Sequence, residues 1–421
     1  MAGKMRLVII GNGAAGIAAL DAIRKVDSSS TVTVIDRESV PAYSRITTPY
    51  FIKGAIPKEK DLYLRSKAFY QEPGIRAVLG CAVEGIDTRE RTVILDRGKK
   101  EPFDSLLIAG GASPKRPAIP GVSEKDLLVL RDLADARKLK KIRGQGTTGV
   151  FIGAGLVSLQ TLQAMHTDES RSILVVKSDR VLSQTLDAAG AQIIEKRLRD
   201  RGVRVMKGCE VHHREKDGTV VLDTQERLRA DFIFAGKGVR PNTDFLEGSG
   251  IIADNGILVN RRLETNIEGI YAAGDVVRAP DFFTGRQVTY GLWPSALEQG
   301  EIAGKNMAGA KVEYEGNLRM NVSAIFGLSL ASVGDLGSER VKDVWVTEDT
   351  RGQVYRKLCL DEEGVLIGAV LINRMNDIGV IQGMIRGRRR AEPLLANSAW
   401  KSSVSYGLSS AVRVYSRVVC C

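Results

Sequence analysis

A glycine-rich turn occurs twice in this chain, each time between an apolar segment and a helix-like segment. The first copy reads VIIGNGAAGIAAL at residues 8–20, and the second reads VFIGAGLVSLQTL at residues 150–162. Such a turn leaves backbone N–H groups free at the start of a helix, where they can bind a phosphate group. The sequence therefore predicts two α/β units, each with a phosphate site. A length of 421 residues is sufficient for two or three domains.

The first copy has the context of a dinucleotide-binding unit. A strand-like segment, MRLVII, precedes the turn, a helix-like segment follows it, and the next strand-like segment, TVTVIDRE, contains Asp36. Gly11 permits the tight turn, Gly13 lets phosphate approach the backbone, and Gly16 allows close helix packing. Asp36 lies twenty positions beyond Gly16 and is expected to bind a ribose hydroxyl pair. The alternative is a structural turn without a ligand.

The second copy keeps Gly153 and Gly155, but Ser158 takes the third glycine position. Serine is small enough for the packing role there. After the next strand-like segment, Lys177 stands where a ribose-binding carboxylate is expected, and Asp179 follows two residues later. Lys177 could bind a 2′-phosphate, as in NADP, Asp179 could bind the ribose of NAD, or Lys177 could simply face water.

The basic charge of the chain has more than one interpretation. The net charge is +11, and part of the excess lies in one late run. That charge could steer an acidic protein or belong to an ordinary solvated surface. No RNA-binding motif, zinc finger or basic heptad helix accompanies it, so nucleic acid is not the expected partner. The run comprises Arg386, Arg388, Arg389 and Arg390.

The cysteines argue against a disulfide framework and against an iron–sulfur cluster within this chain. Their number is odd, and no CxxC pair occurs among Cys81, Cys209, Cys359, Cys420 and Cys421. The adjacent pair at the end could be a redox or metal element, but two thiols are too few for a cluster. No apolar run reaches the length of a membrane span, and the first strand begins too early for a signal peptide. A cytoplasmic location is expected.

Four separated motifs resemble those of the FAD- and NAD(P)-dependent pyridine-nucleotide reductases. They are GNGAAG with Asp36, AGGASPKRPAIPG, GVRPN and IYAAGDV, and the resemblance covers roughly residues 5–385. It implies an α/β fold with two Rossmann-like dinucleotide-binding domains and a C-terminal α+β interface domain. The implied domains are an FAD domain in two parts, 1–112 and 239–315, an NAD(P) domain, 113–238, an interface domain, 316–385, and a basic tail, 386–421.

The stretch PAYSRITTPYFIKG identifies a branch of this family. Members that reduce disulfides carry cysteine here, whereas this chain has Ser44 and Arg45 and no cysteine, so a thiol mechanism is not expected. The branch is similar to nitrite and rubredoxin reductases and to the FAD subunits of multisubunit iron–sulfur enzymes, such as tungsten aldehyde oxidoreductases and phenylglyoxylate dehydrogenases. A lysine found in some ferredoxin reductases is replaced by Tyr50.

The resemblance also implies the cofactor-binding residues. Trp293 begins a segment that resembles the family's helix facing the flavin pyrimidine. If the resemblance is set aside, Trp293 could instead be an aromatic residue of the core. The residues expected at FAD are Gly11, Gly13, Ala14, Ala15, Gly16, Asp36, Arg37, Ser44, Arg45, Val83, Ala109, Gly110, Gly111, Gly274, Asp275, Trp293, Glu298 and Gln299. Those expected at the nicotinamide nucleotide are Gly153, Gly155, Leu156, Val157, Ser158, Lys177 and Gly236.

The expected function is electron transfer between NAD(P)(H) and an iron–sulfur protein, in an oligomer or hetero-complex, with NAD(H) favoured over NADP(H). No protein metal site is expected, and no side chain needs to form a covalent bond, because hydride transfer is flavin chemistry. The rival hypotheses are a stand-alone NAD(P)H oxidase and a non-catalytic FAD-binding sensor or scaffold. His212 and His213 are expected to point to opposite faces of a strand and to take no part in catalysis.

Overall fold

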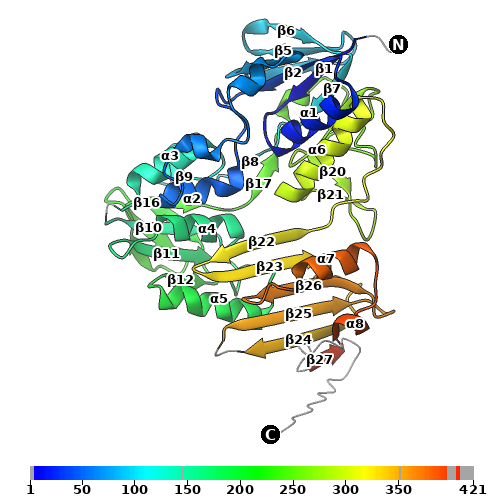
Figure 1. The fold of residues 1–421 in the computed structure, drawn as a ribbon. Coiled ribbons are helices and arrows are strands. Elements are labelled where there is room, and N and C mark those ends of the chain that lie inside the picture. The colour runs from blue at the N-terminus through cyan, green and yellow to red at the C-terminus, as the bar shows by residue number, and fades with distance from the viewer. Residues whose placement is uncertain (1–3, 145, 350–351, 396–403, 408–421) are drawn as a thin grey trace. The chain divides into compact units, whose positions relative to one another are not determined.

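A computed structural model describes residues 4–144, 146–349 and 352–395 and the backbone of residues 404–407 (Figure 1). Cys420, Cys421 and most of the basic tail lie outside these residues. The chain divides into two compact units. The first unit comprises Met1–Lys115, Arg131–Ala136 and Gly238–Leu318, and the second comprises Arg116–Leu130, Arg137–Lys237 and Arg319–Cys421.

A five-stranded parallel sheet forms the centre of the first unit, in the order β19-β7-β1-β2-β3. Its inner strands read as continuous apolar runs because both faces are covered. Helix α6 packs closely along α1, where a Cβ on Gly300 would lie 2.2 Å from the carbonyl oxygen of Ala15. The elements are β1 (Arg6–Ile10), α1 (Ala14–Val26), β2 (Thr31–Asp36), β3 (Ile75–Leu79), β7 (Ser105–Ile108), β19 (Ile270–Ala272) and α6 (Trp293–Met307).

Smaller sheets surround this centre. Strands β4 (Val83–Asp87), β5 (Thr92–Leu95) and β6 (Lys100–Pro102) form an antiparallel sheet. Strands β8 (Ala112–Pro114) and β17 (Val239–Pro241) pair antiparallel. The segment that leaves the first unit and the segment that returns to it therefore lie side by side. A third sheet contains β18 (Ile257–Leu258), β20 (Val277–Pro280) and β21 (Gln287–Val288). The short helices are η1 (Arg45–Thr47), α2 (Thr48–Lys53), η2 (Glu59–Leu62), η3 (Ala68–Gln71), η4 (Asp96–Gly98) and η5 (Asp244–Leu246).

The second unit contains another five-stranded parallel sheet, in the order β12-β11-β10-β16-β9. As in the first unit, a three-stranded antiparallel sheet accompanies it, made of β13 (Val211–Arg214), β14 (Thr219–Leu222) and β15 (Arg227–Arg229). The main elements are β9 (Leu127–Leu128), β10 (Thr148–Ile152), α4 (Leu156–Met165), β11 (Arg171–Val176), α5 (Ala188–Asp200), β12 (Arg204–Lys207) and β16 (Phe232–Ala235). Helix α3 (Leu133–Ile142) joins residues assigned to both units.

A six-stranded antiparallel sheet completes the second unit, in the order β22-β23-β26-β25-β24-β27. Its strand β22 lies beside α4, where Gln160 Nε2 donates to Ser323 Oγ over 2.8 Å. Tyr355 Oη also donates to the Asp187 side chain at the start of α5, over 2.6 Å. The elements are β22 (Met320–Ile325), β23 (Leu328–Gly334), β24 (Asp343–Asp349), β25 (Val354–Leu360), β26 (Leu366–Ile372), α7 (Ile378–Arg386), α8 (Glu392–Leu395) and β27 (Val404–Gly407).

The structure confirms the predicted fold class of two Rossmann-like α/β halves with a C-terminal sheet domain. The prediction that His212 and His213 point to opposite faces of a strand was wrong. The rings of His212 and His213 lie 5.2 Å apart, because a β-bulge between Val211 and His213 interrupts the alternation of side chains. Two adjacent rings alone do not form a metal site, and no cluster of three metal-binding side chains occurs within the described ranges.

Candidate dinucleotide sites

The first glycine-rich turn, residues 11–16, joins β1 to α1. Gly11 has a φ of +107°, and a Cβ there would lie 2.2 Å from the carbonyl oxygen of Ala109. A Cβ on Gly16 would lie 1.9 Å from the carbonyl oxygen of Gly11, whereas one on Gly13 would meet no atom within 4 Å. Gly11 and Gly16 are therefore required by packing, and open space lies beside Gly13, where the helix N–H groups are free. Ala14 and Ala15 are buried in the first turn of α1.

Asp36 closes this turn from the end of β2. Its carboxylate accepts hydrogen bonds from the backbone N–H of Asn12, over 2.6 Å, and of Glu38, over 2.8 Å. Burial raises the pKa of Asp36 above its ordinary value, although these backbone hydrogen bonds oppose the shift. A carboxylate has more than two acceptor positions, so Asp36 can still receive ribose hydroxyls. Its neighbour Arg37 is exposed, and Val83 lies partly buried on β4.

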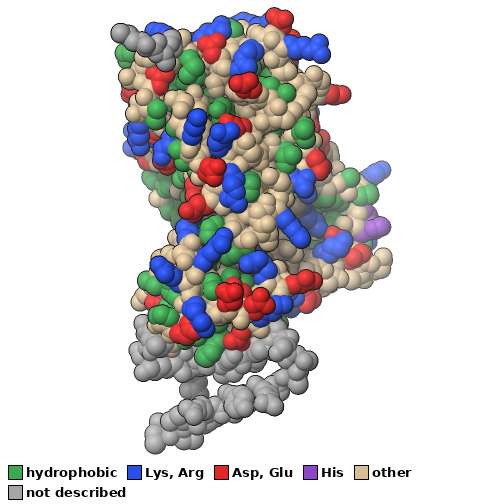
Figure 2. Space-filling model, turned by 90° about the vertical axis from the view of Figure 1, so that its right-hand side faces the viewer, with side chains coloured by type: hydrophobic (Ala, Val, Ile, Leu, Met, Phe, Trp, Pro, Cys, Tyr) green, Lys and Arg blue, Asp and Glu red, His purple; other side chains and the backbone are tan. Residues whose placement is uncertain are grey.

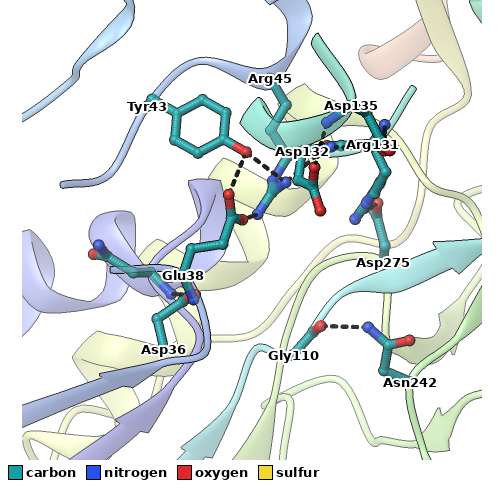
Figure 3. Close-up of polar contacts among 11 residues, drawn as sticks. Asp36, Glu38, Tyr43, Arg45, Gly110, Arg131, Asp132, Asp135, Asn242 and Asp275 are labelled. Atoms are coloured by element: carbon teal, nitrogen blue, oxygen red, sulfur yellow. Dashed lines mark hydrogen bonds and ion pairs between the residues drawn. The ribbon is translucent and has the colours of Figure 1, made fainter. Parts of the chain in front are cut away.

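Arg45 is held in a network of polar side chains (Figure 3). Its guanidinium donates to Glu38 over 2.6 Å, to Tyr43 Oη over 2.9 Å and to the carbonyl oxygen of Arg131 over 2.7 Å. The Tyr43 hydroxyl in turn donates to Glu38, and burial raises the pKa of Tyr43, so its proton stays in place at neutral pH. Arg45 thus fixes the segment after Ser44 to the loop before α3.

Asp275 forms an ion pair with Arg131, at 3.0 Å between guanidinium nitrogen and carboxylate oxygen (Figure 3). About a fifth of each side chain is exposed. A Cβ on Gly111 would lie 3.0 Å from the Arg131 guanidinium, so the Gly111 turn, the arginine and Asp275 lie close together. Arg131 is not among the residues expected from the sequence. It lies outside the recognised motifs, and only its position just ahead of a helix start could have indicated it.

The turn after β7 is held by the GVRPN motif. Asn242 Nδ2 donates to the carbonyl oxygen of Gly110 over 2.8 Å (Figure 3). The Asn242 backbone N–H donates to the carbonyl oxygen of Gly111 over 3.0 Å. Ser113 Oγ donates to Asn242 Oδ1 over 2.7 Å. The asparagine therefore fixes the conformation of the turn that begins at Ala109.

Helix α6 begins at Trp293, which is only partly buried and has Pro294 beside it in the first turn. Glu298 is also partly buried. Gln299 is 1% exposed; its Oε1 accepts from the backbone N–H of Gly274 over 2.8 Å, and its Nε2 donates to Asn317 over 2.9 Å. The Gln299 amide is thus engaged with protein groups and fixes the backbone that leads to Asp275.

The second glycine-rich turn, residues 153–158, joins β10 to α4 in the same way. Gly153 has a φ of +90°, and a Cβ there would lie 2.6 Å from the carbonyl oxygen of Gly236. A Cβ on Gly236 would lie 1.9 Å from Ser158 Oγ, so the fully buried serine fills the space of the third glycine. Space is open beside Gly155, Leu156 is partly buried and Val157 is half exposed.

The Lys177 side chain is 74% exposed and forms an ion pair at the surface. Its ammonium lies 2.9 Å from Glu210 Oε2, and Lys237, which directly follows Gly236, lies 2.7 Å from Glu210 Oε1. Asp179 is bound by both oxygens to its neighbour Arg180. Glu210 and Lys237 are not among the residues expected from the sequence, because neither belongs to a recognised motif.

The described cysteines do not lie in the segment around Arg45. Cys81, Cys209 and Cys359 are all buried free thiols, and burial raises the pKa of each, that of Cys359 to about 12. Thiols of this kind are poor nucleophiles at neutral pH. No helix in the described part of the chain is long and apolar enough to cross a membrane.

Comparison with known proteins finds relatives that match most of the chain. The chain is 31% identical to subunit epsilon of the NADH-dependent phenylglyoxylate dehydrogenase of Aromatoleum evansii, covering 92% of this chain and 93% of that protein. It is 31% identical to an NADH oxidase of Methanocaldococcus jannaschii, with 87% of each covered. It is 27% identical to the ferredoxin–NAD(+) reductase component of the p-cumate 2,3-dioxygenase system of Pseudomonas putida, covering 92% and 95%.

A solved structure shows the same fold. Putidaredoxin reductase, in its covalent complex with putidaredoxin, matches with a TM-score of 0.86 and 24% identity over 95% of this chain and 98% of that chain. Residues 320–389 match the C-terminal domain of rubredoxin NAD+ reductase. Residues 5–300, which contain both glycine-rich turns, match the pyridine nucleotide-disulphide oxidoreductase family. The chain is therefore an oxidoreductase and belongs to the pyridine nucleotide-disulphide oxidoreductase family.

Proposed function

We propose that this chain is an FAD-dependent oxidoreductase that passes electrons between NAD(H) and an iron–sulfur protein. The observation that carries the proposal is the pairing of two glycine-rich dinucleotide turns with a segment at Ser44 and Arg45 that holds no thiol. Because this segment has no cysteine, it contains no disulfide that a reduced flavin could reduce. We therefore place the electron acceptor or donor in a separate protein.

The residues of the first unit fit FAD. The space beside Gly13 and the free N–H groups at the start of α1 suit a pyrophosphate, because the helix start carries partial positive charge. Asp36 would hold the adenosine ribose, and Asp275, with Arg131, would lie at the ribityl and pyrophosphate region. The start of α6 at Trp293 would place positive helix potential near the flavin pyrimidine.

Bound FAD supplies the chemistry, since it exchanges a hydride with a nicotinamide and single electrons with an iron–sulfur centre. The chain's own residues bind the cofactor and orient it. Arg45 anchors the segment after Ser44 through Glu38 and the backbone of Arg131, which keeps this wall of the site rigid. Gln299 fixes the backbone N–H of Gly274 and so sets the position of Asp275.

The partner is inferred from charge and from relatives. A net charge of +11 suits an acidic ferredoxin-like protein, which would be attracted over a distance. On the face drawn in Figure 2, basic side chains are interspersed with acidic ones. On that face, steering of an acidic partner would come from the net charge. The similarity to a dehydrogenase subunit and to a ferredoxin reductase component supports a place in a multisubunit or two-protein system. Free buried thiols such as Cys81 agree with a reducing cytoplasm.

A second candidate is a stand-alone NADH oxidase, which the similarity to the Methanocaldococcus jannaschii protein favours. The two functions are separated by following NADH oxidation by the FAD-loaded chain in air and, anaerobically, with a [2Fe–2S] ferredoxin and cytochrome c. We expect slow oxidation in air and a rate that rises with ferredoxin concentration. Fast oxidation in air that ferredoxin leaves unchanged would favour the oxidase. No oxidation in either assay would favour a non-catalytic FAD-binding protein.

A further inference from the structure

The second glycine-rich turn lacks an acidic residue at the usual place. In dinucleotide-binding units a carboxylate at the end of the second strand receives the adenosine ribose hydroxyls. Here that strand is β11, and the residue after its last position, Val176, is Lys177. A lysine alone would favour a 2′-phosphate, and hence NADPH.

The structure brings a carboxylate to this lysine from the next strand. Strands β11 and β12 pair in parallel, with Val176 opposite Lys207, so the residues that follow each strand reach the same edge of the sheet. Glu210 lies there, and its oxygens lie 2.9 Å from the Lys177 ammonium and 2.7 Å from that of Lys237. Hydrogen bonds from Lys237 and then from Lys177 lower the pKa of Glu210, so it is ionised at neutral pH.

Among the described residues nearby, Arg180 does not add an unpaired cation. Arg180 is paired with Asp179, and Arg180 Nε also donates to the carbonyl oxygen of Leu186. The Asp223 carboxylate accepts from the backbone N–H of Glu210 over 3.0 Å and adds a second negative charge beside it. Both lysines therefore face carboxylates before any nucleotide arrives.

We propose that Glu210 supplies the carboxylate that position 177 lacks and makes the second site select NADH over NADPH. This inference rests on the proposed function in one respect: the second glycine-rich turn is taken to be the site of the nicotinamide nucleotide. A carboxylate offers about four acceptor positions, so Glu210 can hold both lysines and still accept from ribose hydroxyls. A 2′-phosphate would meet the like charge of Glu210 and would have to draw Lys177 away from it.

The test measures binding without electron transfer. Isothermal titration of the FAD-loaded full chain would use ADP-ribose, which mimics NADH, and 2′-phospho-ADP-ribose, which mimics NADPH. In the Glu210→Gln variant we expect ADP-ribose to bind about tenfold more weakly, since a charged acceptor is lost. The phosphorylated ligand should bind more tightly than it does to the unaltered chain, because the lysines are released.

The matched control is Glu215→Gln, because Glu215 also has both oxygens on a basic partner, Arg227, and is similarly exposed. It should leave both affinities unchanged. In the double variant Glu210→Gln with Lys177→Met, the gain for the phosphorylated ligand should disappear. Melting temperatures establish that each variant is folded, and Glu210→Asp, which keeps the charge, should retain the preference for ADP-ribose.

An unchanged ratio of the two affinities in Glu210→Gln would overturn the proposal. Failure of the unaltered chain to bind either ligand would overturn it as well, because the second turn would then hold no nucleotide. Tight ADP-ribose binding together with a flavin that NADH does not reduce would instead count against the proposed function and leave the role of Glu210 standing.

Discussion

Replacing Gly300 by alanine should destabilise the first unit and weaken its hold on FAD. The new Cβ would lie 2.2 Å from the carbonyl oxygen of Ala15 and 2.7 Å from its Cα, whereas ordinary contacts begin near 3.4 Å. Both atoms belong to the backbone of α1, so α6 must move away by about 1 Å in a core that is close-packed. The same α1 carries the first glycine-rich turn, and a Cβ on Gly274 would lie 3.1 Å from the Cβ of Ala15. A shift of α6 therefore disturbs the site.

The size of the effect follows from two opposing terms. Overpacking costs about 1–3 kcal/mol, and a clash with backbone atoms belongs in the upper part of that range, about 2–3 kcal/mol. Alanine gains about 1 kcal/mol over glycine in a helix interior. We expect a net loss of about 1–2 kcal/mol and a melting temperature lower by roughly 2–8 °C for a unit of this size. FAD content after gel filtration should fall in the same variant. Calorimetry and the flavin absorbance of the purified protein measure the two quantities.

The control is the same substitution in another helix. Gly383 is exposed in α7, and a Cβ there would meet no atom within 4 Å. Gly383→Ala should therefore be neutral or stabilising, by up to about 1 kcal/mol, with FAD content unchanged. A Gly300→Ala protein that melts no lower than the unaltered chain and keeps its full FAD content would refute the account of how α6 and α1 position the first site.

Four further outcomes are expected. Asp36→Asn should weaken FAD binding about 10- to 100-fold, because a charge-assisted hydrogen bond is lost; equilibrium dialysis measures this, and full FAD retention would contradict the ribose role. Burial raises the pKa of Asp36 above 3.8, so the folded state disfavours the charged form of this carboxyl. FAD retention by the unaltered chain should therefore decline as the pH falls through that raised pKa. The Asp36→Asn variant should lack this pH dependence. Replacing Cys81, Cys209 and Cys359 by alanine should leave NADH oxidation with ferredoxin intact, since these thiols are buried with raised pKa values; loss of that rate in a folded, FAD-loaded variant would point to a thiol step. Arg131→Met should leave Asp275 without its ion-pair partner and lower FAD affinity, measured by the same dialysis, whereas an unchanged affinity would dismiss a role for the pair.

Local sequence signals were enough to predict both glycine-rich turns and the general fold. Each turn combines glycines with a preceding apolar strand and a following helix, and those signals lie within about twenty residues. Ser158 is expected to serve a packing role, and it packs so closely on Gly236 that a Cβ on that glycine would lie 1.9 Å from Ser158 Oγ. The absence of cysteine near Arg45 could also be read directly from the sequence.

The contacts between distant segments could not be predicted in this way. Arg45 reaches the backbone of Arg131 across 86 positions, and Lys237 reaches Glu210 across 27. Such pairs depend on the order of strands in a sheet, which periodicity does not give. For the same reason the pairing of Lys177 with Glu210 has no signature in the sequence, and neither has the bulge that brings His212 and His213 together.

The most direct test of the central claim is an anaerobic titration of the FAD-loaded chain with NADH and, separately, with NADPH, while the absorbance of oxidised flavin is followed. The account predicts stoichiometric bleaching by NADH and a much weaker response to NADPH at equal concentration. A flavin that stays oxidised with both nucleotides would contradict the claim that this chain transfers electrons between a nicotinamide nucleotide and its flavin.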